Sequence, residues 1–156
     1  MRRTDKAITD RQQIDAIIRG SLVCRLAVVE AGQPYLVPLS FGYDGAAFYF
    51  HTAPEGRKIA AFLAGGEVCF ECERNVEVRR DPQNACRWSM DYESVIGYGT
   101  IAELTTDEEK RHALNLIMRQ YSEADWHFDT AAMSKTRAWK LTITSMNGKQ
   151  SKPKIV

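Results

Sequence analysis

The stretch around which the chain is organised spans residues 48–63 and reads FYFHTAPEGRKIAAFL. It opens with an aromatic run that is typical of a β-strand, and it then turns at Pro54-Glu55-Gly56. Apolar residues next recur at helical spacing, which predicts a short helix packed through Ile59, Phe62 and Leu63. The sequence therefore places a strand, a tight turn and a helix start next to one another.

Two cations, Arg57 and Lys58, open that helix directly after Gly56. Free backbone N–H groups at a helix start favour an anion, an Arg side chain offers a planar fork to a phosphate, and Lys adds a point charge. Two positive charges there oppose the helix dipole unless an anion lies between them. The pattern therefore predicts a phosphate site with His51 one strand end away. An ordinary solvated turn with a surface histidine remains the alternative.

The chain has 156 residues and a mass of 17.7 kDa, which suits one domain over residues 1–156. Its formal net charge is +1, so neither a nucleic acid nor a membrane is indicated as a partner. The basic residues at the start are not followed by a long apolar run, so we expect no signal peptide and no transmembrane span. The expected compartment is the cytoplasm.

Four cysteines include a C-x-x-C spacing at Cys69 and Cys72. This pair lies in a strand-like run, where residues three apart point to opposite faces. That geometry suits neither a shared metal ion nor a thioredoxin-type pair, so no metal site is predicted. Free and mostly buried thiols in a reducing compartment fit the pattern better, with Cys24 and Cys86 as the other two.

Three strand-like runs cover residues 22–29, 34–43 and 47–52. Turn signals separate them, so we expect a three-stranded meander. Pro38 lies within the middle run. Because proline cannot donate to a strand ladder, Pro38 belongs at a sheet edge or at an interruption that leaves backbone groups free to bind a ligand. Both interpretations stay open at this point.

The rest of the chain predicts further strands over residues 67–73, extended by 75–80, and over 88–103 and 137–144. Gly97 and Gly99 mark a bulge, a bend or a close backbone approach in the long strand. Asp10 can cap a first helix, and Thr106 with Glu109 forms the capping box of another. Residues 1–8 are expected to form an N-terminal arm and residues 147–156 a basic, mobile tail.

About six or seven strands with three short helices imply a mainly β fold with flanking helices. The expected architecture is a small antiparallel barrel or sandwich. Closure of the sheet would remove its unpaired edges.

Several segments together resemble one known family. They are the motif His51-x-x-x-Glu55-Gly56-Arg57-Lys58, and the segments PLSFGY at 38–43, CRWSMDYESVIGYG at 86–99 and MRRTDKAITD at 1–10. In combination they are similar to the nitroimidazole-resistance (Nim) branch of the pyridoxamine-phosphate-oxidase-like flavoproteins. The resemblance covers nearly the whole chain, and the motifs are far more specific together than any one is alone.

The resemblance implies an antiparallel FMN-binding split β-barrel, built as a homodimer with FMN in a cleft between the subunits. Arg57 and Lys58, which follow Gly56, would hold the FMN phosphate. The backbone beside the polar edge of the isoalloxazine ring would be that of Pro38, Leu39, Ser40 and Phe41.

The resemblance also implies that the same groove is lined by Phe50, His51 and Thr52. From the partner subunit, the residues that would approach the flavin are Tyr92, Ser94 and Val95. In the Nim branch the histidine that matches His51 lies close to the flavin and is implicated in its chemistry. A dimer groove would enclose a flavin better than a barrel of this size alone.

The family resemblance favours an FMN-dependent reductase of small electron-poor acceptors such as nitroaromatics or quinones, with His51 as the catalytic residue. Oxidation of pyridoxamine phosphate is not expected, because residues 139–146 do not match the Arg-rich C-terminal motif of the true oxidases. Two alternatives stay open: an FMN store, carrier or sensor without turnover, and a relative that binds haem or a deazaflavin instead. Haem would require one of the three histidines as axial ligand.

Overall fold

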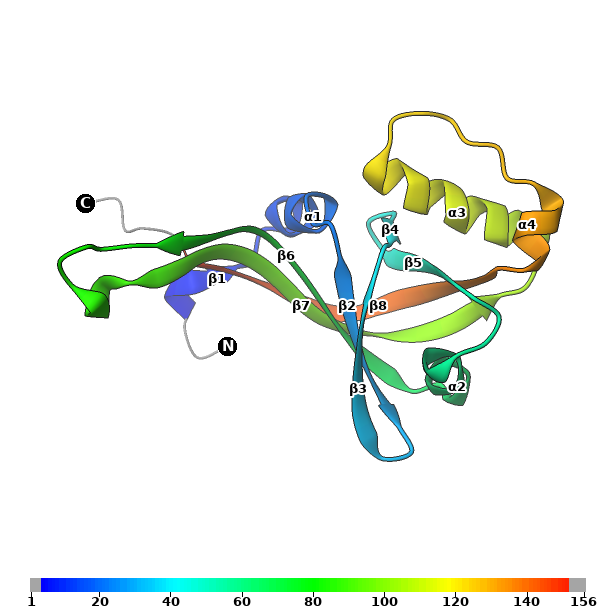
Figure 1. Cartoon of the computed structure of the whole chain (residues 1–156), viewed down its shortest axis with the longest axis horizontal. Helices are drawn as coiled ribbons and strands as arrows, with labels where there is room; N and C mark the ends of the chain where they lie inside the picture. Colours follow the sequence, from blue (N-terminus) through cyan, green and yellow to red (C-terminus); the bar gives the residue numbers. More distant parts are fainter. Residues whose placement is uncertain (1–3, 152–156) are drawn as a thin grey trace.

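The chain folds around one antiparallel sheet in this computed structural model, which describes residues 4–151 (Figure 1). The strands are β1 (Ala7–Ile8), β2 (Cys24–Glu30), β3 (Gln33–Leu39), β4 (Gly42–Tyr43), β5 (Ala47–Thr52), β6 (Glu67–Arg79), β7 (Ser89–Leu104) and β8 (Arg137–Ser151). The helices are η1 (Thr4–Lys6), α1 (Arg11–Arg19), α2 (Arg57–Ala64), η2 (Ala85–Arg87), α3 (Asp107–Tyr121) and α4 (Thr130–Ser134). The predicted mainly β, antiparallel fold of split-barrel type is confirmed.

The sheet does not close into a barrel. Its strand order is β3-β2-β6-β7-β8-β5-β4, with β1 paired to the free side of β8. The strands at the two ends of this order, β3 and β4, are consecutive in the chain and are joined by Ser40 and Phe41 alone. The sheet therefore curls until its two ends nearly meet, but the expectation that closure removes its edges is wrong.

The expected meander of three strands is also wrong, because the run over residues 34–43 is two strands. β3 pairs with β2, whereas β4 pairs with β5 on the other side of the split. Between them the backbone N–H of Phe41 donates to the Tyr121 hydroxyl at 3.0 Å instead of to a neighbouring strand. Pro38 lies in β3, at an end of the strand order, so the edge interpretation of this proline is confirmed.

The final strand is longer than the sequence indicates. Residues 147–151, which the sequence assigns to a mobile tail, continue β8 and pair with β7 up to the Tyr92–Ser151 pair. They also pair with β1, so Ile8 is buried and part of the predicted arm lies in the sheet. Gly148 permits this, because a Cβ there would lie 2.8 Å from that of Ile8. Residues 1–3 and 152–156 lie outside the described residues.

An aromatic core fills the inside of the curled sheet. Phe48 lies in contact with Phe50 and Phe70, with ring centroids 6.2 and 4.7 Å apart. Helix α2 adds Phe62, whose ring meets the Trp139 indole edge to face at 5.1 Å. The side chains that α2 buries are Ile59, Ala61 and Phe62, whereas Leu63, expected on the same face, is exposed. The contact between Phe62 and Trp139 thereby holds α2 against β8.

The other helices follow their sequence signals. The Asp10 side chain caps α1 by accepting from the Gln12 N–H at 3.1 Å, and α1 packs through three isoleucines. Thr106 and Glu109 form the predicted capping box of α3. Within residues 4–151, no helix combines the length and apolar character needed to cross a membrane.

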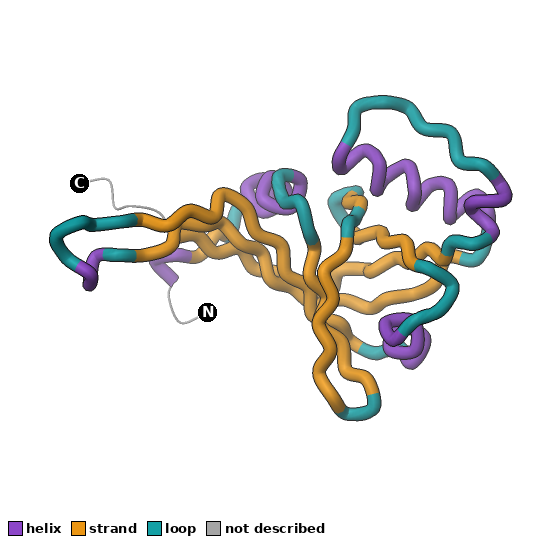
Figure 2. The backbone as a smooth tube through the Cα atoms, viewed as in Figure 1, coloured by secondary structure: helices purple, strands orange, loops and turns teal. Residues whose placement is uncertain are grey.

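Strands β6 and β7 extend beyond the body of the sheet as a second arm, distinct from the N-terminal one, which Figures 1 and 2 show on the left. The register of the two strands shifts between Arg74 and Glu77, where Asn75 adopts a positive φ of 55°. Apolar side chains are exposed along this arm: Val76, Val78, Trp88 and Met90.

We expect Gly97→Ala to destabilise the fold by roughly 1–3 kcal/mol, because the added methyl group overpacks the core. A Cβ at Gly97 would lie 2.5 Å from the Ser145 carbonyl oxygen and against the Phe70 ring. Urea unfolding followed by circular dichroism measures the change, and Thr100→Ala, at an exposed site of the same strand, is the control. Equal midpoints for the two variants would contradict the proposed close approach.

Candidate functional site

Helix α2 follows β5 in the chain after a short turn, and its first two residues are the two predicted cations. Gly56 precedes it with φ 136°, a backbone conformation that side chains with a Cβ rarely adopt. No side chain caps the helix, and its first turn contains no acid. Arg137 of β8 donates a hydrogen bond to the carbonyl of Pro54 at 3.3 Å, which links the turn before α2 to the sheet. The result is an uncapped helix N-terminus with two positive charges.

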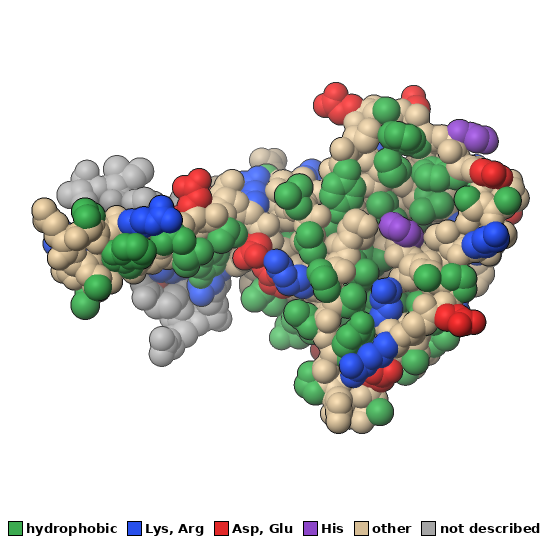
Figure 3. All heavy atoms as spheres, in the orientation of Figure 1, with side chains coloured by type: hydrophobic (Ala, Val, Ile, Leu, Met, Phe, Trp, Pro, Cys, Tyr) green, Lys and Arg blue, Asp and Glu red, His purple; other side chains and the backbone are tan. Residues whose placement is uncertain are grey.

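Arg57 is held by the β2–β3 hairpin. Its Nε pairs with the carboxylate of Glu30, and its guanidinium lies over the Tyr35 ring at 4.4 Å from the centroid. Lys58, in contrast, makes no salt bridge within residues 4–151. Figure 3 shows basic side chains beside acidic ones over the region of β3 and α2. The two predicted phosphate cations therefore lie together, one oriented by neighbours and one unpaired.

His51 lies near the end of β5, opposite Ala138 of β8, and its side chain is exposed. Neighbouring protein atoms partly desolvate the ring, and the positive charge of Lys58 adds to that effect, so the pKa of His51 falls below its ordinary value. The neutral form of the imidazole is therefore favoured over the charged form. In that state one ring nitrogen can donate a hydrogen bond while the other accepts one.

Only His51 of the three predicted groove residues on β5 exposes its side chain. The Phe50 ring is fully buried in the core, and the Thr52 hydroxyl accepts a hydrogen bond from the Trp139 indole at 3.0 Å. The reason is the two-residue period of a strand, which turns both neighbours of His51 inward. Any contact of Phe50 or Thr52 with a ligand would therefore involve the backbone.

The predicted ring-binding segment lies where β3 ends and the chain crosses the split. Pro38 and Ser40 are exposed, Leu39 is half-buried, and Phe41 is completely buried. Because the Phe41 N–H already donates to Tyr121, it is not free for a ligand. Ser40 follows the last residue of β3, so this exposed end of an edge strand is the part of the segment that a ligand can approach.

The structure does not bring Tyr92, Ser94 or Val95 to this site within one chain. His51 pairs with Ala138, which in turn pairs with Leu104 of β7. Tyr92 lies twelve positions further along that strand, a path of roughly 40 Å at about 3.3 Å per residue. Val95 is also buried, and Ser94 is nearly so. Contact of these residues with a ligand at His51 stays a prediction that requires a second copy of the chain.

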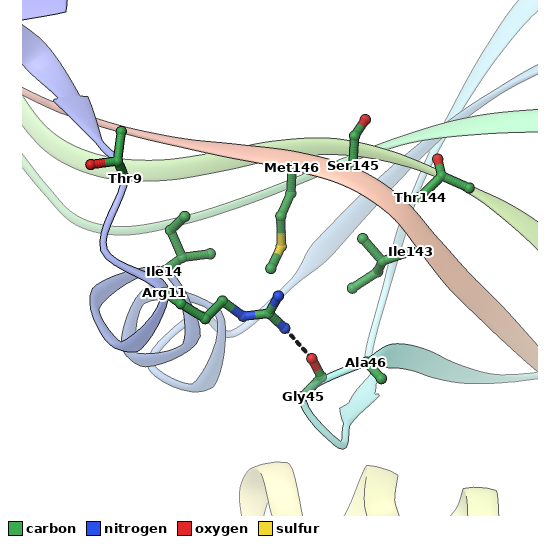
Figure 4. Close-up of a pocket in the computed structure, with 9 residues that line it drawn as sticks. All are labelled: Thr9, Arg11, Ile14, Gly45, Ala46, Ile143, Thr144, Ser145 and Met146. Atoms are coloured by element: carbon green, nitrogen blue, oxygen red, sulfur yellow. Dashed lines mark hydrogen bonds between the residues drawn. The ribbon is translucent and has the colours of Figure 1, made fainter.

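A separate hollow of about 430 Å³ lies between α1, the turn before β5, and β8 (Figure 4). Arg11 reaches across it from α1 to the carbonyl of Gly45, and Ile143 and Met146 of β8 line it. The sheet register shifts here, where β8 passes from its pairing with β5 to its pairing with β1. None of the predicted site residues lines this hollow.

The described residues 4–151 contain no group of three or more His, Cys, Asp or Glu side chains that could hold a metal ion. Cys72 is buried and Cys69 is partly exposed, as expected for residues on opposite faces of β6.

Glu30 and Tyr35 are site residues that sequence reasoning missed. They flank the Ala31-Gly32 turn, in which both residues adopt positive φ. The sequence signals the turn but not what the hairpin touches, since Arg57 lies 27 residues beyond Glu30. No local signal identifies such a long-range partner.

Comparisons with known proteins agree with this fold. The family model described as Pyridoxamine 5'-phosphate oxidase matches residues 10–150. A protein from Bacteroides thetaiotaomicron assigned to 5-nitroimidazole antibiotic resistance is 32% identical, with a TM-score of 0.82, over 92% of this chain and 86% of that one. Among curated proteins, none matches the sequence.

Two further solved structures share the fold at lower identity. A flavocytochrome from Azotobacter vinelandii is 17% identical, with a TM-score of 0.85, over 98% of this chain and 72% of that one. An FAD and heme binding protein from Mycobacterium smegmatis is 18% identical, with a TM-score of 0.81, over 95% of this chain and 74% of that one.

We expect Lys58→Ala to raise the pKa of His51 toward about 6.5, because a like charge is removed while the partial burial remains. An NMR titration of the imidazole measures the shift, with Lys149→Ala at the far end of β8 as the control. An unchanged pKa in Lys58→Ala would contradict the coupling between Lys58 and His51.

The lowered pKa of His51 also makes stability depend on pH. The unfolded chain binds the imidazole proton more tightly than the folded protein does. The contribution of His51 to the free energy of unfolding therefore falls as the pH drops from about 6.5 through the lowered pKa.

Proposed function

The chain belongs to the pyridoxamine 5'-phosphate oxidase family, and on that basis we propose that it is a flavoprotein that binds FMN and reduces small electron-poor acceptors. The observation that carries this proposal is the uncapped, doubly cationic start of α2 next to His51. Nitroaromatic compounds and quinones are the proposed acceptors. The 32% identical relative, which is assigned to 5-nitroimidazole resistance, supports this choice of class.

A flavin is the cofactor class that the fold neighbours favour. The two more distant structures are those of a flavocytochrome and of an FAD and heme binding protein. Those ligands are properties of those proteins, and at 17–18% identity the likeness itself concerns the fold. Together with the cationic helix start, they support a phosphate-bearing flavin here.

The residues at the start of α2 fit a phosphate group. Three kinds of group there can bind phosphate oxygens: the free backbone N–H groups of the uncapped helix, the planar guanidinium of Arg57 and the ammonium group of Lys58. No acid lies in the first helical turn to compete for them. We therefore assign Arg57 and Lys58 to the FMN phosphate, and Gly56 to the backbone conformation that exposes the helix start.

The residues near the ring would bind the flavin and would orient and polarise the acceptor. When bound, the flavin supplies the electron-transfer chemistry. The exposed end of β3 at Pro38–Ser40 offers a backbone edge for the polar side of the ring. The neutral imidazole of His51 carries one ring N–H, which can donate a hydrogen bond to an oxygen of the acceptor and so stabilise the negative charge that develops there during reduction.

We further propose that a second copy of the chain completes the site. Tyr92 is partly exposed on β7, far from His51 in its own chain, and would reach a flavin bound to the partner. Ile96 and Tyr98 on the same strand are 48% and 44% exposed, an apolar surface that an interface between two copies would cover. A two-fold dimer would then contain two equivalent sites.

Two other functions would use the same fold. The protein could hold FMN as a store, carrier or sensor without catalytic turnover, in which case reduced FMN would reoxidise slowly with every acceptor. The flavocytochrome and FAD and heme neighbours favour testing haem as well, and a deazaflavin is the remaining cofactor. An axial haem ligand would come from His51, His112 or His127, all of which are exposed.

We expect the double variant Arg57→Ala with Lys58→Ala to raise the Kd for FMN on the order of 100-fold or more, since each charge-assisted hydrogen bond contributes roughly 1.5–3 kcal/mol and 1.4 kcal/mol is a factor of ten. Flavin absorbance retained after desalting, followed by a titration, measures binding. The control removes the same charge from α3, with Lys110→Ala and Arg119→Ala. Full FMN occupancy in the double variant would exclude this phosphate site.

We expect His51→Ala to slow turnover on the order of 100-fold, the range for loss of one hydrogen-bond donor to a developing negative charge, while FMN content stays unchanged. The rate is that at which a quinone or a nitroaromatic compound reoxidises the dithionite-reduced holoprotein. His112→Ala on α3 is the matched control. Wild-type rates in His51→Ala would remove the catalytic role, and loss of FMN would make His51 a binding residue instead.

A further inference from the structure

The guanidinium of Arg57 is in contact with the β2–β3 hairpin on two sides. One edge is occupied, because Nε donates to the Glu30 carboxylate at the end of β2. One face is covered, because the Tyr35 ring of β3 lies 4.4 Å from the central carbon of the guanidinium. The two contacts come from strands that flank one tight turn. The hairpin therefore sets both the plane of the guanidinium and its rotation within that plane.

The other edge of the same group is free. Within residues 4–151, the terminal amino groups of Arg57 make no hydrogen bond or ion pair. These two groups lie in one plane and can donate in parallel to two phosphate oxygens. About half of the Arg57 side chain is exposed, so solvent or a ligand can reach them. The contacts with the hairpin thus leave the phosphate-binding edge open.

We propose that Tyr35 is a positioning residue that orients Arg57 for the phosphate of the flavin, while Glu30 anchors the opposite edge of the guanidinium. The inference rests on the proposed function of the site. An exposed arginine that is free to rotate loses conformational freedom when it binds, whereas an arginine already stacked on a ring loses less. Tyr35 acts through Arg57 and does not itself contact the flavin.

Tyr35 gives a cleaner test than Glu30. The Glu30 carboxylate has two opposing effects, since it orients the guanidinium but also repels a nearby phosphate. Tyr35 carries no charge on the face that it offers, so its removal has one expected sign. Tyr35→Phe keeps the ring and is the conservative variant, and Tyr35→Ala removes it.

We expect Tyr35→Ala to weaken FMN binding by roughly two- to fivefold, the range for an exposed cation–π contact, and Tyr35→Phe to leave it unchanged. Binding of riboflavin, which has no phosphate, should be the same in all three proteins. In an Arg57→Ala background, Tyr35→Ala should have no further effect on FMN binding. An equal loss of riboflavin binding, or the same loss without Arg57, would overturn the positioning role.

A second measurement needs no flavin. In an NMR spectrum of arginine side chains, the Arg57 Nε–H should be displaced by the ring current of Tyr35, and Tyr35→Ala should remove that displacement while the contact with Glu30 remains. An unchanged resonance would overturn the inference even if FMN binds. Failure of the wild-type protein to bind FMN would instead overturn the proposed function, and with it the phosphate role of the oriented Arg57.

Discussion

The pairing of β8 with strands on both of its sides is the constraint on which the rest of the structure depends. On one side β8 follows β7 for nearly its whole length, and on the other it pairs with β5 and then with β1. The β5 pairing sets His51 opposite Ala138 and places Thr52 within hydrogen-bond distance of the Trp139 indole. Trp139 in turn packs on α2, and Arg137 binds the turn before that helix. One strand thus positions β5, which carries His51, and the start of α2, which carries the two cations.

The start of α2 departs from the charge pattern that is usual at a helix N-terminus. Cations at a helix N-terminus are unfavourable, and natural helices place acids there, as α3 does with three in its first turn. Helix α2 has Arg57 and Lys58 instead, and the acid that pairs with Arg57 comes from another strand, at Glu30. Departures of this kind concentrate at functional sites, where a ligand supplies what the local sequence lacks.

The split in the sheet separates two kinds of surface. At the split, the chain leaves the β2–β3 ladder and enters the β4–β5 ladder through Ser40 and Phe41, so the edge strand β3 ends at an exposed residue. Along the arm, β6 and β7 carry exposed apolar side chains far from that point. Because roughly 40 Å of strand separates Tyr92 from the level of His51, one chain cannot bring both to a single small ligand. A site that used both surfaces would be shared between two copies.

Several local features could be predicted from the sequence: β5 from its aromatic run, the α3 capping box, the turn at Gly56 and the two cations that open α2. Each depends on residues within a few positions of one another, which is the range of propensity, capping and periodicity. The folded structure was needed for the break at Phe41, the edge position of Pro38, the extension of β8 to Ser151, the inward direction of Phe50 and Thr52, and the contacts of Glu30 and Tyr35 with Arg57. These depend on which distant strands pair, and pairing is set by burial of the whole core rather than by local pattern.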